Sequence, residues 1–227
     1  MIHNQADFAV YEPAEAARIL GISSQKIRRW LSGYSYQSAE GKKQRLPLWD
    51  PKYGDDEDLY LGFRDLIEIR FVDAFVRAGL SKNSVRSLLT NARQLIDSNY
   101  PLSTAQFKTD GKTIFLQTIS GSDEHCAIDV KNGQHVFQSV VQPSFRDLDF
   151  EDGIVSKWYV DGRRNKIAID PEVAFGQPVI DETGIPTSRL LEAFNAEKSE
   201  RIVANQFDLP ISVVRRAIEF ERKLRSR

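Results

Sequence analysis

The stretch PAEAARILGISSQKIRRWL, residues 13–31, places a small residue, a turn residue and a β-branched residue at a characteristic spacing. They are Ala17, Gly21 four places later, and Ile27 six places after that. This spacing is typical of a helix-turn-helix, because the small side chain lets two helices approach, glycine bends between them without steric cost, and the branched side chain packs the second helix onto the first. We expect two short helices joined by a sharp turn.

The same spacing recurs near the other end of the chain, in SERIVANQFDLPISVVRRAI, residues 199–218. Here the three positions are Ala204, Asp208 and Val214. Aspartate adopts a left-handed turn less readily than glycine, so the first copy matches the pattern better. Two such units predict, in the first instance, a regulator that binds nucleic acid.

Composition and length are those of an ordinary globular protein. The chain has 227 residues, of which 41% are hydrophobic and 28% charged, enough for two modest domains. No apolar run approaches the ~18 residues of a membrane span, and the first residues lack the pattern of a signal peptide. We therefore expect a cytoplasmic protein with no membrane partner.

No pattern in the sequence points to catalysis. The metal-capable residues that cluster are His125, Cys126 and His135, which offer too few thiol and imidazole ligands at zinc-site spacing. A single cysteine also excludes an internal disulfide, and neither a phosphate-binding glycine loop nor a nucleophile-elbow serine is present. The sequence predicts a protein that is not an enzyme and has no metal or cofactor.

The formal net charge of −1 argues weakly against DNA, since most DNA-binding proteins carry a basic excess. Its distribution matters more, because basic residues gather on the second helix, in the loop after it and at the carboxyl end. Lys26, Arg28 and Arg29 should be free to reach outward; the alternative is a merely solvated charged face. The full set expected to contact DNA is Ser24, Gln25, Lys26, Arg28, Arg29, Tyr34, Tyr36, Lys42, Lys43 and Arg45.

Several of these residues fall in a segment that predicts a hairpin. The polar stretch SAEGKKQ, residues 38–44, resembles a hairpin tip, with tyrosines entering it and apolar residues leaving it. A hairpin beside a helix-turn-helix is a wing, whose basic tip can lie along a phosphate backbone. Tyr34 and Tyr36 would add phosphate hydrogen bonds, although core packing is the alternative role for at least one of them.

Serines and helix-breaking residues mark where the helices of this first module start and stop. Ser23 or Ser24 should cap the second helix, and a later helix should start after Ser81 and stop before residues 99–101. Between them, an apolar pattern from Phe63 to Gly79 is strongly helical.

With the segments YEPAEAARILGISSQKIRRWL (11–31) and RDLIEIRFVDAFVRAGLSKNSVR (64–86), the module resembles the winged-helix DNA-binding domain of MerR regulators. That resemblance implies that the second helix approaches the major groove and that the wing contacts the backbone. The chain lacks the long helix after Ile96 through which MerR proteins form dimers.

The middle of the chain predicts a small antiparallel sheet. Short β-rich pieces over 113–119, 126–130, 154–160 and 165–170 alternate with the turn dipeptides Asp110-Gly111, Asn132-Gly133, Asp152-Gly153 and Asp161-Gly162. The piece HVFQSVV, residues 135–141, is compatible with strand or helix. Such a sheet would be marginal alone, so it should pack on a neighbouring domain or a second subunit.

The last module predicts three helices, the first starting at a cap on Thr187 or Ser188. Its phrase DPEVAFGQPVIDETGIPTS, residues 170–188, resembles a small uncharacterised family found in bacterial antitoxins, often coded beside a toxin with a PIN-like nuclease fold. The whole architecture resembles a VapB-type antitoxin. Residues expected to contact the partner are Arg189, Arg215, Arg216 and Phe220, although a solvated face is an equal alternative for the two helix arginines.

Together these features predict an α+β, mainly α fold. A winged helix-turn-helix domain (1–100) would be followed by a β-rich dimerisation segment (101–163) and a helix-turn-helix-like carboxyl domain (164–227). The predicted function is that of an antitoxin that binds operator DNA as a homodimer, represses its own operon and neutralises a PIN-like ribonuclease. The alternatives are a free-standing MerR-like regulator whose middle segment senses a ligand, and an adaptor whose carboxyl module binds protein.

Overall fold

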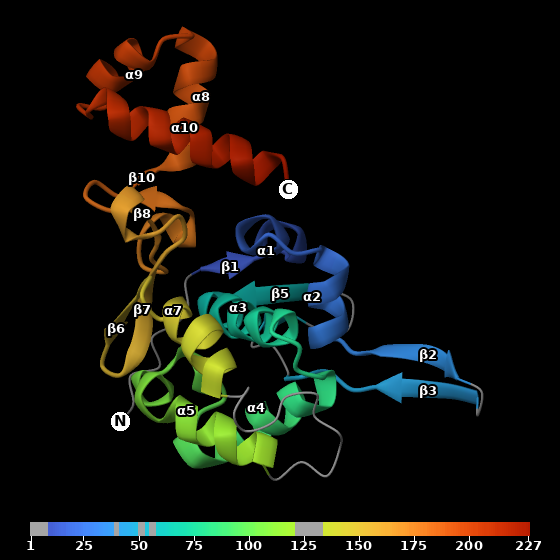
Figure 1. Ribbon diagram of the computed structural model, residues 1–227. Helices are drawn as coiled ribbons and strands as arrows, with labels where there is room; N and C mark the ends of the chain where they lie inside the picture. The colour runs from blue at the N-terminus through green and yellow to red at the C-terminus, as the bar shows by residue number, and fades with distance from the viewer. Residues whose placement is uncertain (1–8, 39–40, 50–52, 55–57, 121–133) are drawn as a thin grey trace.

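The computed structural model describes residues 9–38, 41–49, 53–54, 58–120 and 134–227. A helical body formed by the first half of the chain carries a projecting hairpin, and an antiparallel sheet links this body to a three-helix unit formed by the end of the chain (Figure 1). The mixture of helix and strand agrees with the expected α+β class. None of the described helices is both long and apolar enough to cross a membrane.

The first two helices have nearly the expected bounds. They are α1 (Pro13–Leu20) and α2 (Ser24–Leu31), joined at Gly21, whose φ of 69° is left-handed. Ser23 is the cap of α2, since its side chain accepts a hydrogen bond from the backbone N–H of Lys26 at 3.2 Å. On α2, Ile27 is 0% exposed, so the apolar face of the helix is turned into the core.

Short strands accompany these helices. A three-stranded sheet has the order β1 (Val10–Tyr11), β5 (Leu59–Gly62), β4 (Tyr53–Gly54). The hairpin expected between Tyr34 and Trp49 is present as β2 (Tyr34–Ser38) paired antiparallel with β3 (Gly41–Arg45), with Tyr34 opposite Arg45. It projects from the helical body beside α2 (Figure 1).

The main core forms around α3 (Phe63–Arg77) and α4 (Lys82–Ile96). Helix α4 starts after Ser81, as expected, and Ser81 caps it by accepting a hydrogen bond from the backbone N–H of Ser84 at 3.0 Å. After α4 the chain makes a short 3-10 turn, η1 (Pro101–Ser103), and then enters α5.

The strand expected over residues 113–119 is wrong, because this segment belongs to α5 (Ala105–Ser120). Phe107, Ile114 and Phe115 recur at helical spacing and are all at most 5% exposed. The Phe115 ring stacks on Phe75 of α3 at 5.6 Å between centroids. Tertiary packing of this apolar stripe therefore outweighs the β propensity of the segment and the turn tendency of Asp110-Gly111.

Residues 135–141, compatible with either structure, are helical. They lead through η2 (Phe137–Val141) into α7 (Gln142–Ser144), and the Phe137 ring lies 5.9 Å from that of Phe115. The piece 126–130 and the turn Asn132-Gly133 lie outside the described residues.

The expected antiparallel sheet is present in the later part of the chain. Its order is β10 (Ile185–Pro186), β9 (Val179–Ile180), β8 (Ile167–Ile169), β7 (Ile154–Tyr159), β6 (Leu148–Glu151). Asp152-Gly153 makes the β6–β7 turn, and Asp161-Gly162 and η3 (Arg163–Asn165) lie between β7 and β8. The sheet therefore contains strands from both sides of the boundary expected at residues 163/164.

The three expected carboxyl helices are α8 (Thr187–Glu197), α9 (Glu200–Gln206) and α10 (Ile211–Arg225), which enclose a second apolar core. Asp208 adopts the left-handed turn that its position requires, with φ 51°. The cap expected at Thr187 or Ser188 is wrong, because Pro186 is the capping residue and Thr187 is already helical. The Thr187 side chain is instead buried, 2.5 Å from Glu221 Oε1.

Residues from the first helices and strands contact the last part of the chain at two places. Tyr11 donates a buried hydrogen bond to the Gly176 carbonyl at 2.8 Å, and Gly176 belongs to the short turn η4 (Ala174–Gly176). A Cβ at position 176 would lie 2.3 Å from the Tyr11 hydroxyl and 2.4 Å from Ala9 Cβ, so only glycine fits. At the other contact, Arg227 donates to the carbonyls of Arg18 and Ile19.

The buried carboxyl of Glu68 makes fold stability depend on pH. Glu68 is 1% exposed, and burial raises its pKa from 4.5 to about 8. Between these pH values the unfolded chain loses this proton and the folded chain keeps it, so stability falls as pH rises toward the folded pKa, by ~1.4 kcal/mol per pH unit.

We expect Glu68→Gln to remove this loss. Urea unfolding at pH 5 and pH 8 should show the variant gaining about 3 kcal/mol on the wild type between the two pH values. Parallel pH profiles for the two proteins would contradict the assignment.

Candidate nucleic-acid interface

The cationic surface of the first module is assembled from α2, the β2–β3 hairpin and the start of α4. Arg28 and Arg29 of α2 are exposed, because Ile27 and Leu31 occupy the buried face of that helix. Gln25 is also exposed, whereas Ser24 is only partly so. Lys42 and Lys43 are exposed on β3.

The expectation that Lys26 is free to reach outward is wrong. Its ammonium lies 2.6 Å from Asp73 Oδ1 on α3 and 4.9 Å from the Trp30 ring centroid. Asp73 is 7% exposed and also pairs with Arg77 at 2.6 Å. Because Asp73 is buried, these cations compensate its charge, and Lys26 fixes α2 to α3.

Tyr34 lies at the centre of a cluster of cations. The guanidinium of Arg29 is 5.5 Å from its ring centroid, and the Lys82 ammonium is 5.3 Å away and donates to the Tyr34 hydroxyl at 3.3 Å. The hydrogen bond from Lys82 lowers the pKa of Tyr34. Arg45 covers the neighbouring Tyr36 at 5.9 Å and donates to Asn83 at 3.0 Å.

Lys82 and Arg86 were missed by reasoning from sequence. Ser81 marks a helix start, but nothing local indicates that this start packs against the base of the hairpin. Arg86 donates to the carbonyls of Leu46 and Pro47 at 2.8 Å each, which fixes the exit of the hairpin. The resulting surface brings exposed guanidinium and ammonium groups together with a hydroxyl, the groups that bind phosphate.

The residues expected to bind a protein partner differ in how exposed they are. Arg189 is exposed, with its side chain 3.8 Å from Glu192. Arg215 is held by Glu200, with a shortest contact of 2.8 Å, and Arg216 is only partly exposed. Phe220 is 6% exposed and belongs to the carboxyl core, so the expectation that it contacts a partner is wrong.

Exposed apolar side chains lie elsewhere in the second half of the chain. Phe175 is 79% exposed, Ile202 43% and Ile211 42%. Phe175 and its neighbour Ala174 both have left-handed backbones, with φ of 56° and 49°. No local signal in the sequence distinguishes the exposed Phe175 from the buried Phe220.

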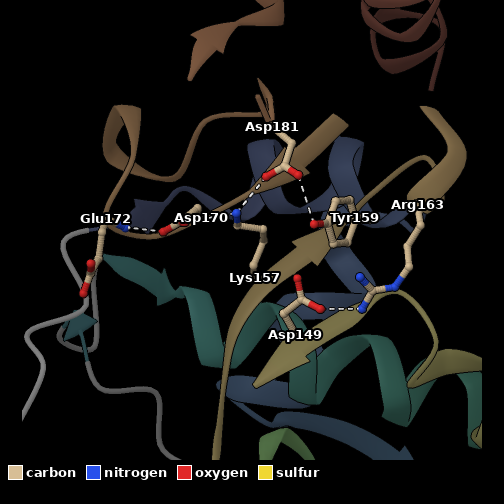
Figure 2. Close-up of polar contacts among 7 residues, drawn as sticks. All are labelled: Asp149, Lys157, Tyr159, Arg163, Asp170, Glu172 and Asp181. Carbon is tan, nitrogen blue, oxygen red and sulfur yellow. Dashed lines mark hydrogen bonds and ion pairs between the residues drawn. The ribbon is translucent and has the colours of Figure 1, made fainter. Parts of the chain in front are cut away.

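A cluster of ion pairs and hydrogen bonds links the strands of the antiparallel sheet (Figure 2). Lys157 of β7 lies 2.7 Å from Asp181 and 3.9 Å from Asp170, and the Tyr159 hydroxyl donates to Asp181 at 3.0 Å. The hydrogen bond to Asp181 raises the pKa of Lys157. Burial by itself would raise the pKa of Asp181, but the hydrogen bonds from Lys157 and Tyr159 outweigh burial, so the pKa of Asp181 is lowered. Both groups therefore stay charged near neutral pH and tie β7 to the end of β9.

Among the described residues, no group of three or more His, Cys, Asp or Glu side chains could hold a metal ion. His125 and Cys126 lie outside this part of the chain, and His135 is exposed.

Comparison with known proteins places this chain beside a protein family, a curated protein and a solved structure. Residues 167–220 match the family described as "Protein of unknown function (DUF433)". The chain is 24% identical over 230 residues to "Putative antitoxin VapB45" of Mycobacterium tuberculosis (strain ATCC 25618 / H37Rv), covering 94% of each protein. It also resembles the X-ray crystal structure of Rv2018 from Mycobacterium tuberculosis, with a TM-score of 0.69, 18% identity and coverage of 92% of this chain and 96% of that one. The structural likeness shows a shared fold.

Gly33 sets the position of the hairpin relative to α2. Its φ is +67°, and a Cβ there would lie 2.3 Å from the Arg45 carbonyl oxygen. We expect Gly33→Ala to lower the free energy of unfolding by at least ~2 kcal/mol, because it adds a backbone clash to left-handed strain.

Gly41→Ala is the matched control, since Gly41 also has a positive φ but nothing lies within 4 Å of its Cβ position. Urea denaturation should show the larger loss for position 33. Equal losses would contradict the proposed role of the Gly33–Arg45 approach.

Proposed function

We propose that this protein is the antitoxin of a type II toxin–antitoxin module, which binds operator DNA to repress its own operon and neutralises a PIN-like ribonuclease. The observation that carries the proposal is the alignment with "Putative antitoxin VapB45" over 94% of both chains. An antitoxin role requires two surfaces, one for DNA and one for the toxin. The cationic face of the first module and the exposed apolar residues of the second half of the chain supply candidates for these surfaces.

In this proposal the first module is a winged helix-turn-helix. Arg28 and Arg29 on α2 would enter the major groove, where each good base contact contributes ~1–3 kcal/mol. The hairpin is the wing, and Lys42, Lys43 and Arg45 would lie along the phosphates with Tyr34 and Tyr36. Lys82 would add a phosphate contact beside Tyr34. Lys26 is paired with Asp73, so we give it no leading role in this proposed surface.

A homodimer would place two copies of α2 in successive major grooves, ~34 Å apart on a palindromic operator. The α4 helix ends at Ile96 and a 3-10 turn follows, so a long pairing helix does not continue from it. We propose that the chains pair instead through the antiparallel sheet or the carboxyl helices.

The double variant Arg28→Ala/Arg29→Ala tests the DNA surface. Both side chains are exposed, so the fold should persist while operator affinity falls at least ~30-fold, as expected for two lost contacts. Gel shift of the upstream promoter fragment at fixed salt measures the change. Arg201→Ala, an exposed arginine on α9, is the control and should bind as the wild type does. Unchanged binding of the double variant would exclude α2 as the helix that contacts the operator.

For the toxin, we propose that Phe175 is the principal anchor. Each left-handed non-glycine residue costs of the order of 1–3 kcal/mol, and the contact between Tyr11 and Gly176 holds this turn in place. The fold thus keeps a strained backbone that presents an aromatic ring to solvent, and rigid aromatic anchors dominate many protein interfaces. Arg215, by contrast, is already paired with Glu200.

Phe175→Gly separates recognition from stability. It removes the ring and relieves the left-handed strain, so the melting temperature should stay equal or rise, while capture of the nuclease encoded beside this gene should fall at least ~10-fold. Phe175→Tyr should retain capture, and Ile202→Ala is a control for another exposed apolar residue. If Phe175→Gly still captures the nuclease, the anchor lies elsewhere; if the wild type does not capture it, the antitoxin proposal itself fails.

A further inference from the structure

A cleft of about 200 Å³ separates α1 from the carboxyl module. Its walls come from α1, from the segment before β9, and from α8 and α10. A volume of this size exceeds what a single water molecule needs and suits a small metabolite. The cleft is distinct from the cationic surface on α2 and from the Phe175 turn, because neither contributes a residue to its walls.

One wall carries a carboxylate that forms no ion pair with any described residue. Glu221 of α10 is 7% exposed, and its Oε1 lies 2.5 Å from the Thr187 hydroxyl. Neither an ion pair nor a second hydrogen bond reaches Glu221 from any described residue. A carboxylate with one hydrogen-bond donor and no ion pair can accept a further positive group, and the cleft leaves room for one.

The facing wall supplies a second carboxylate. Glu15 of α1 lines the same cleft, and burial raises its pKa although the charge of Arg18 opposes the shift. Ile19, Pro178 and Leu224 provide apolar surface in the same cleft. The cleft therefore brings carboxylates from two distant parts of the chain together with apolar surface.

We propose that this cleft binds a small molecule carrying a primary ammonium group, which sits between Glu221 and Glu15. Two sources have this chemistry: a free amino acid, and a plain amine such as a diamine. Arg18 and Arg225 also line the cleft and are exposed, so they can pair with the carboxylate of an amino acid.

Occupation of the cleft would join the two modules. The ligand would bridge α1 and α10, which already meet where Arg227 donates to the Arg18 and Ile19 carbonyls. Because α1 carries α2 through the turn at Gly21, a ligand held here would favour one arrangement of the carboxyl module relative to the cationic surface. This inference is independent of the proposed toxin partner.

The experiment uses the full-length protein and three sets of probes. These are the twenty L-amino acids singly, the diamines putrescine and cadaverine, and 4-methylpentanoate, which is leucine without its ammonium group. Calorimetric titration at millimolar concentration should show saturable binding of at least one amino acid or diamine and none of 4-methylpentanoate. Binding by amino acids or by diamines identifies the source of the ammonium.

Variants then place the ligand. Glu221→Gln and Glu15→Gln should each weaken binding at least ~10-fold, since each removes one charge that faces the ammonium. Glu219→Gln, an exposed carboxylate on the same helix outside the cleft, should bind as the wild type does. Because Glu15→Gln alters a partly exposed residue, it keeps the test valid if Glu221→Gln fails to fold.

Three results would overturn the proposal. They are the absence of saturable binding by every ammonium compound, equal binding of 4-methylpentanoate, and binding that both cleft variants leave unchanged.

Discussion

The hydrogen bond from the Tyr11 hydroxyl to the Gly176 carbonyl joins positions 165 residues apart in the chain, and much of the arrangement described above depends on it. It is buried, so leaving either group without its partner would cost the desolvation of a polar atom. Position 176 must be glycine because Ala9 and Tyr11 occupy the space of a side chain. With this contact in place, β1 is held against the turn that presents Phe175, and α1 faces the carboxyl helices across the cleft.

A net charge near zero conceals a strongly uneven surface. On the first module, exposed Arg28 and Arg29 lie near Tyr34 and the start of α4, where Lys82 adds a further cation. In the carboxyl module, Glu200 neutralises Arg215. The second helix-turn-helix unit therefore presents less free positive charge than the first. The two units share the same residue spacing, but their surfaces carry different charge. This difference in charge supports separate partners for the two modules.

Local features of the fold were predictable where the controlling interaction spans a few residues. Gly21 and Asp208 take the left-handed turns expected of them, and Ser23 caps α2. The strand predicted over residues 113–119 was wrong, because packing against aromatic rings from distant parts of the chain favours helix over strand there. Residues 135–141, left open between strand and helix, are helical where they pack on the same rings.

The sequence by itself determined where α2 and α4 begin and where the two helix-turn-helix units turn, because capping and left-handed turns depend on groups within about one helical turn of each other. It also determined which faces of those helices are apolar. Only the tertiary structure decided that Lys26 pairs with Asp73, that Phe220 is buried while Phe175 is exposed, and that Glu15 and Glu221 line one cleft. These outcomes depend on how separately formed elements pack, since burial and charge compensation are set by neighbours in space that lie far apart along the chain.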